Sequence, residues 1–81
     1  MIRWKPKAKK QLIPLPRPLV ERIVSAVENF YSTGVGEVKP LKGKYKGLYR
    51  LRVGNYRIIF QWLENGDMEI IEVLSREDAY R

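Results

Sequence analysis

The sequence predicts an α+β domain in which two N-terminal helices pack on one face of a small antiparallel β-sheet. The first observation is a change of period, because apolar residues recur every three or four positions in the first half and every second position later. The second is a pair of turn sequences, Gly54-Asn55 and residues 64–67, which suit hairpin connections. The third is length, since 81 residues suffice for one domain, 1–81, and not for two.

The first half is expected to hold a short strand and two helices. Residues 2–5 suit a strand, and residues 6–13 suit a short helix with Pro6 in its first turn. The proline-rich stretch 14–18 must end this helix, because a proline disfavours helical backbone in the residue before it. A second helix is expected over about 18–32, closed by the glycines that follow. Its apolar stripe consists of Leu19, Val20, Ile23, Val27 and Phe30.

Three strands of a meander are expected in the second half, over residues 49–53, 56–63 and 68–74. A two-residue turn at Gly54-Asn55 fixes the pairing of the first two strands. Arg52 then faces Arg57 across the hairpin, and the side chains sort onto two faces. The face expected to lie under the helices carries Tyr49, Leu51, Val53, Tyr56, Ile58, Phe60 and Trp62.

Three arginines, Arg50, Arg52 and Arg57, share the other face of this hairpin. Like charges directly opposite each other destabilise a sheet by up to ~1 kcal/mol. The predicted hairpin places no glutamate opposite Arg52 to offset this repulsion. Because locally unfavourable choices tend to mark functional sites, the three side chains are interpreted as a preformed anion site. The alternative is that Glu69 or Glu72 neutralises them, or that the face is only a solvated surface.

Composition points to a polyanionic partner and excludes several chemistries. The net charge is +7 with a pI near 9.9, which favours nucleic acid, although solubility alone would also explain it. The chain has neither cysteine nor histidine, so a thiol nucleophile, soft metal ligands and the commonest general base are missing. We therefore expect no metal and no cofactor. With no apolar run near ~20 residues and no signal core, we expect a cytoplasmic protein without membrane contact.

Basic residues continue along the segment before the hairpin, where no acidic residue interrupts them from Lys39 to Arg57. The lysines are interpreted as non-specific phosphate contacts in a loop, and they are Lys39, Lys42, Lys44 and Lys46. Tyr45, between two glycines, is the candidate for stacking on a base. Tyr49 lies on the predicted core face and is more plausible as a core residue.

The hairpin sequence Tyr-Arg-Leu-Arg-Val-Gly-Asn-Tyr-Arg, residues 49–57, resembles the RelE/ParE toxin superfamily, and the similarity extends over almost the whole chain. This resemblance implies an acidic antitoxin partner and, in the RelE branch, cleavage of messenger RNA in the ribosomal A site. The basic pair of the family falls on Arg50 and Arg52, and its strand arginine falls on Arg57. The C-terminal arginine and tyrosine of the family fall on Arg76 and Tyr80.

The resemblance also implies roles for these side chains. Arg57 and Arg76 would neutralise the charge that develops at phosphorus. Tyr80 would act as general base or stack on a base, unless it merely covers the sheet edge. Arginines stand where some relatives have lysines, and Ser75 stands where many have a basic residue. Because arginine is essentially never deprotonated, the base role stays open among Tyr80, Glu77 and Lys46.

Three functions remain open from the sequence. The first is a ribosome-dependent endoribonuclease toxin, with messenger RNA, the ribosome and an acidic antitoxin as partners. The second is a ParE-like inhibitor that binds DNA gyrase and cuts nothing. The third is a vestigial module that binds antitoxin or RNA without toxicity. A monomer is the expectation for the free chain, and whether the natural chain continues further stays open.

Overall fold

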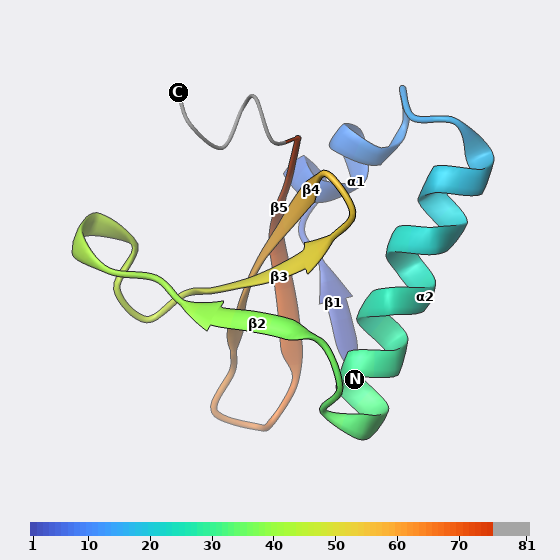
Figure 1. The fold of residues 1–81 in the computed structure, drawn as a ribbon. Helices are drawn as coiled ribbons and strands as arrows, with labels where there is room; N and C mark the ends of the chain where they lie inside the picture. The colour runs from blue at the N-terminus through green and yellow to red at the C-terminus, as the bar shows by residue number, and fades with distance from the viewer. Residues whose placement is uncertain (76–81) are drawn as a thin grey trace.

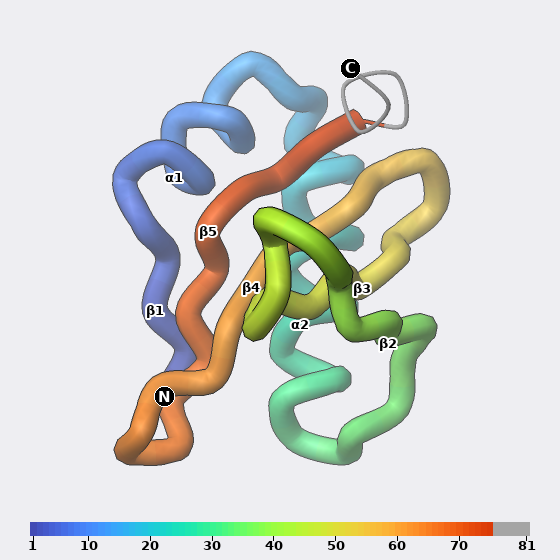
Figure 2. Tube along the Cα trace, turned by 90° about the vertical axis from the view of Figure 1, so that its left-hand side faces the viewer, coloured from blue at the N-terminus to red at the C-terminus, as the bar shows by residue number. Residues whose placement is uncertain are grey.

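A layer of two helices covers one face of a five-stranded sheet in the computed structural model, which describes residues 1–75 (Figure 1). The elements in chain order are β1 (Ile2–Trp4), α1 (Pro6–Leu12), α2 (Arg17–Thr33), β2 (Glu37–Pro40), the 3₁₀ turn η1 (Gly43–Tyr45), β3 (Tyr49–Val53), β4 (Tyr56–Trp62) and β5 (Met68–Ser75). The strand order across the sheet is β1-β5-β4-β3-β2. Figure 2 shows the strands in this order with α2 behind them and α1 beside β5.

Both helices follow the sequence pattern. Helix α2 buries Ile23 and Val27 completely, as the predicted stripe requires. It ends at Gly34, whose left-handed backbone (φ 76°) lets its N–H donate to the Phe30 carbonyl at 2.8 Å. Helix α1 buries Ala8, which joins the same core. The expected α+β fold with two N-terminal helices is therefore confirmed.

The hairpin between β3 and β4 has the predicted register. Arg52 pairs with Arg57, and Leu51 pairs with Ile58. Gly54 at the turn has φ 59°, and every described residue with positive φ is a glycine, so Asn55 keeps the negative φ of a type II′ turn. The core face is buried as expected, except that Trp62 at the end of β4 is 44% exposed. The rest of that face is made of side chains that are buried or packed against the core.

Two strand pairings differ from the predicted meander. Strand β1 runs parallel to β5, with Ile2 beside Met68, so the sheet is mixed. Strand β2 adds an antiparallel edge strand next to β3. The sequence did not reveal β2, because the strand has only four residues, two of them charged, and ends in proline, which is tolerated at a sheet edge. Lys39 therefore lies on a strand opposite Arg50, and its expected place in a loop was wrong.

A β-bulge interrupts the pairing of β4 with β5. Ile59 pairs with Glu72, whereas the next residue, Phe60, pairs with Ile70, so Ile71 is the extra residue. The bulge reverses the alternation along β5. Met68 and Ile70 before it and Val73 after it are buried in the core, and Glu72 lies on the arginine face. Within the described residues, no helix is long and apolar enough to cross a membrane.

Candidate functional site

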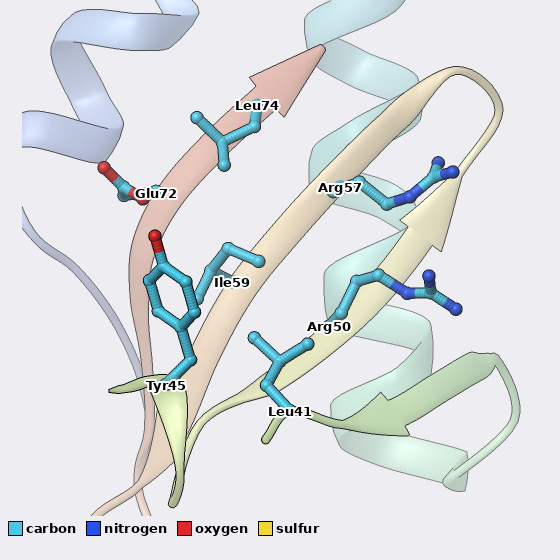
Figure 3. A pocket seen from close by; sticks show the side chains of 7 residues that line it. All are labelled: Leu41, Tyr45, Arg50, Arg57, Ile59, Glu72 and Leu74. Carbon is cyan, nitrogen blue, oxygen red and sulfur yellow. The ribbon is translucent and has the colours of Figure 1, made fainter. Parts of the chain in front are cut away.

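A pocket of about 220 Å³ opens on the sheet face that the helices leave uncovered (Figure 3). Strands β3, β4 and β5 form its floor, and the segment that connects β2 to β3 forms one wall. The lining residues are Leu41, Tyr45, Arg50, Arg57, Ile59, Glu72 and Leu74. The pocket thus combines two guanidinium groups, an aromatic ring, a carboxylate and an apolar floor.

Arg57 is buried at the edge of this pocket. It lies on the central strand β4, between Arg52 of β3 and Leu74 of β5, and only 5% of its surface is exposed. Among the described residues, neither its Nη1 nor Nε of Arg50 has a hydrogen-bond partner, and both atoms are buried. Figure 3 shows both arginine side chains extending in the same direction, away from Tyr45 and Glu72. Because buried polar groups in proteins are normally hydrogen-bonded, these two atoms call for an explanation.

The two glutamates of β5 do not neutralise these arginines. Glu72 pairs with Lys7 of α1. Glu69 accepts a hydrogen bond from Gln61 at 2.7 Å and lies 3.9 Å from the ammonium of Lys5. Within residues 1–75, the glutamates of β5 therefore form ion pairs only with Lys5, which follows β1, and with Lys7 of α1. The cationic end of the pocket has no carboxylate partner in this part of the chain.

Arg52 is separate from the pocket. Its side chain is exposed, and its Nε lies 3.9 Å from Oε2 of Glu37, the residue that pairs with it on β2. The sequence interpretation that no glutamate opposes the arginines was therefore wrong for Arg52, because it missed strand β2. The structure brings Arg50 and Arg57 together in the pocket and leaves Arg52 beside it.

The basic segment before β3 also has some residues at the pocket and others away from it. The ring of Tyr45 forms a wall of the pocket and stays 46% exposed, with the ammonium of Lys44 5.1 Å from its centroid. Such a contact is a cation–π interaction. Lys39 extends the row of cations beyond Arg50. Lys42, Lys44 and Lys46 are exposed and do not line the pocket.

Three candidates from the sequence, Arg76, Glu77 and Tyr80, lie outside the described residues. Their convergence with Arg57 therefore stays a prediction. The sequence reasoning also missed one polar lining residue, Glu72, as a member of the site. Only the bulge at Ile71 aims this side chain into the pocket, and strict alternation along β5 carries no signal for it.

Among the described carboxyl groups, Asp67 has a strongly lowered pKa, and it lies outside the pocket. Asp67 lies in the turn between β4 and β5 and accepts hydrogen bonds from the Met1 amine at 2.9 Å and from Arg3 at 2.8 Å. These two bonds, the amine first, lower the pKa of Asp67 to about 2. The hydroxyl of Tyr31 and then Asp67 raise the pKa of the amine. This cluster fastens the start of β1 to the start of β5.

The arrangement of two helices on a five-stranded sheet defines the class, which is the small α+β fold of the RelE type. RelE in the RelB–RelE antitoxin–toxin complex from Methanococcus jannaschii is 27% identical, with a TM-score of 0.76 over 96% of this chain and 94% of that one. The YoeB/ParE toxin from Agrobacterium tumefaciens is 20% identical, with a TM-score of 0.75 over 91% and 95%. YafQ from E. coli shares the fold at 11% identity, with a TM-score of 0.77 over 100% and 98%.

The sequence also matches a family model over residues 2–80, and that family is described as the ParE toxin of the type II toxin–antitoxin system parDE. The chain belongs to this family, and the expected RelE/ParE superfamily is confirmed. A search of curated proteins finds no match.

Proposed function

We propose that this toxin cuts messenger RNA in the ribosomal A site, by attack of a ribose 2′-hydroxyl on the adjacent phosphorus. The observation that carries the proposal is the buried Arg57 with an unpartnered Nη1 at the edge of an open pocket. The antitoxin, the ribosome and messenger RNA are the proposed partners, and the cytoplasm is the proposed location.

A phosphate satisfies what the fold leaves unsatisfied. A buried donor without a partner costs about 1–3 kcal/mol, and more when it is charged. A domain of this size has a total stability of roughly 4–12 kcal/mol, so this is a large fraction of it. An RNA phosphate would accept hydrogen bonds from Arg57 and Arg50 together, in the bidentate geometry that guanidinium groups favour.

The reaction needs charge stabilisation and two proton transfers. A bond forms from the 2′-oxygen to phosphorus, and the bond from phosphorus to the 5′-oxygen of the next nucleotide breaks. The 2′-hydroxyl gives its proton to a base, the leaving 5′-oxygen takes a proton from an acid, and the products carry a 2′,3′-cyclic phosphate and a 5′-hydroxyl. Arg57 and Arg50 are proposed to stabilise the phosphorane charge, together with Arg76. Tyr80 is the proposed proton carrier, with Glu77 and Lys46 as the other candidates.

The small size of the pocket supports the proposal that cleavage requires the ribosome. A cavity of about 220 Å³ is smaller than ordinary ligand sites of ~300–1,000 Å³, so it would take no more than one nucleotide. Aligning the 2′-oxygen with phosphorus and the leaving oxygen requires that the neighbouring nucleotides be fixed as well. The A site would supply that alignment, and Arg52 with the lysines of the flank would contact the surrounding phosphates.

An acidic antitoxin is proposed as the inhibitor. The toxin in the Methanococcus jannaschii structure is described as part of an antitoxin–toxin complex. With a net charge of +7, this chain favours a partner of opposite charge, and steering makes such association fast. We expect the antitoxin to cover Arg50, Arg52 and Arg57, and the complex to have a lower pI than the toxin.

Gyrase binding is the second candidate, and the match to the ParE family favours it. In that case the arginine face is a docking surface and cuts nothing. The two candidates differ in their products, because inhibition of gyrase leaves messenger RNA intact and blocks DNA supercoiling.

Primer extension on a reporter messenger RNA in a reconstituted translation system tests the proposal. We expect cuts in frame with the A site that require ribosomes and that fall about 100-fold or more in Arg57→Met. Arg17→Met removes the same charge from an exposed site on α2 and should cut like the wild type. Intact message from a folded protein that blocks gyrase supercoiling would move the assignment to gyrase.

A further inference from the structure

Glu72 lies at the end of the pocket away from the arginines, and nothing in the reaction above uses it. We propose that Glu72 reads the base of the bound nucleotide and selects guanine. This inference rests on the proposed function, because it takes the pocket to hold one nucleotide of RNA.

The bulge in β5 aims this side chain into the pocket. Without the extra residue Ile71, the alternation that buries Met68 and Ile70 would turn Glu72 toward the core. Bulges occur next to active sites and re-aim side chains there. A charged residue on this strand therefore reaches the pocket through an irregularity of the backbone.

Helix α1 holds the bulged segment in place by two contacts. Lys7 pairs with Oε1 of Glu72. One turn later on the same helix face, Gln11 Oε1 accepts the backbone N–H of Val73 at 2.6 Å. Glu72 and Val73, the two residues that follow the bulge, are thus both tied to α1. Lys7 approaches Oε1, and because a carboxylate has about four acceptor positions in total, this ion pair leaves acceptor positions for a ligand.

The spacing of the two ends fits one nucleotide. Arg50, Ile59 and Glu72 form one row across β3, β4 and β5. Two strand spacings, roughly 10 Å, separate the backbones of Arg50 and Glu72 at the ends of this row. A phosphate bound at Nε of Arg50 would therefore place its own base over Ile59 and Leu74, with its edge toward Glu72. The ring of Tyr45 stands over the same floor with its hydroxyl toward Glu72 (Figure 3).

The acceptor-only chemistry of a carboxylate decides among the bases. Guanine presents two adjacent donors on its Watson–Crick edge, N1–H and the 2-amino group, which match the two oxygens. Adenine and cytosine each present one amino group beside a ring nitrogen that is an acceptor, and a carboxylate repels that nitrogen. Uracil presents one N–H between two carbonyl oxygens. A bidentate match to a base edge typically gives about a tenfold to hundredfold preference.

Binding of short 2′-O-methyl RNA tests the inference without cleavage. Four trinucleotides that differ only in one base would be titrated with the protein by fluorescence anisotropy. We expect the guanine ligand to bind roughly tenfold to a hundredfold more tightly than the uracil ligand. Glu72→Gln, which keeps one acceptor and adds a donor, should reduce this preference by about tenfold.

Glu69→Gln is the matched control. It makes the same change of charge on the same strand, but Glu69 does not line the pocket. Both variants lose one negative charge and should bind all four ligands somewhat more tightly, so the ratio between ligands is the readout. Thermal melting of both variants checks that each is folded.

The outcomes separate this inference from the function. The role of Glu72 is overturned if the four ligands bind equally, if none binds, or if the guanine preference persists in Glu72→Gln. This holds even if ribosome-dependent cuts occur. A guanine preference lost in Glu72→Gln and kept in Glu69→Gln supports it, even if the message stays uncut.

Discussion

Replacing Arg57 by methionine should stabilise the protein while it weakens RNA binding. Arg57 is 5% exposed, and its Nη1 has no hydrogen-bond partner within residues 1–75. Removing an unsatisfied buried donor recovers about 1–3 kcal/mol. Removing one of two opposed arginines on the sheet recovers a further ~0.2–1 kcal/mol. Methionine fills a similar space against Leu74, so little packing is lost. A net gain of about 2 kcal/mol raises the melting temperature of a domain of this size by roughly 8–16 °C.

Urea titration and thermal melting by circular dichroism measure the gain, and anisotropy with a short single-stranded RNA measures the loss. Hydrogen bonds to charged groups contribute about 1.5–3 kcal/mol, so RNA affinity should fall roughly tenfold to a hundredfold. Arg17→Met, which removes an exposed guanidinium, should change stability by no more than about 0.5 kcal/mol. A lower melting temperature for Arg57→Met would refute the reasoning, because Arg57 would then contribute to the fold.

Three further predictions concern the surroundings of the pocket and the turn before β5. Tyr45→Leu should weaken binding of single-stranded RNA by roughly tenfold through lost stacking, with an unchanged melting temperature because the ring is half exposed. Lys39→Gln should weaken binding of all RNA sequences alike and reduce the slope of log K against log salt by about 0.7, measured between 50 and 300 mM salt, roughly the range in which counterion release is followed; an unchanged slope would exclude a phosphate contact. Asp67→Asn should lower the melting temperature at pH 7, because the pKa of Asp67 is lowered from 3.8 to about 2 by the Met1 amine and Arg3. A lowered carboxylate pKa stabilises the fold above the unfolded value, so the difference from wild type should shrink as the pH falls from about 4 to about 2; a difference that persists below pH 2 would contradict this assignment.

Local pattern carried most of the fold. The stripe of α2 and the turn at Gly54 were sufficient to predict the helix face and the pairing of Arg52 with Arg57, because each depends on residues near in sequence. Strand β2 was not predicted because four residues with one partly buried side chain, Val38, are too few to show a period, and they form a strand only beside the edge of β3. The parallel pairing of β1 with β5 was not predicted either, because nothing local in either strand specifies a distant partner.

The site was predictable in its residue types but not in its environment. The sequence identified Arg50 and Arg57, and their common face follows from the hairpin. The burial of Arg57 depends on having strands on both sides of β4, which is a property of the whole sheet. The direction of Glu72 toward the pocket depends on a β-bulge that residue propensities do not predict. Contacts between distant segments therefore distinguish a solvated basic surface from a pocket with unsatisfied donors.

The position of β5 has a consequence for synthesis. This last described strand lies between β1 and β4, and it supplies Glu72 and Leu74 to the pocket. Its partner β1 is made 66 positions earlier, because Ile2 pairs with Met68. At about 5–20 residues per second, the first strand waits roughly 3–13 s for its neighbour. The pocket is therefore incomplete until residue 74 has been translated, and the nascent chain cannot bind a ligand through this pocket before then.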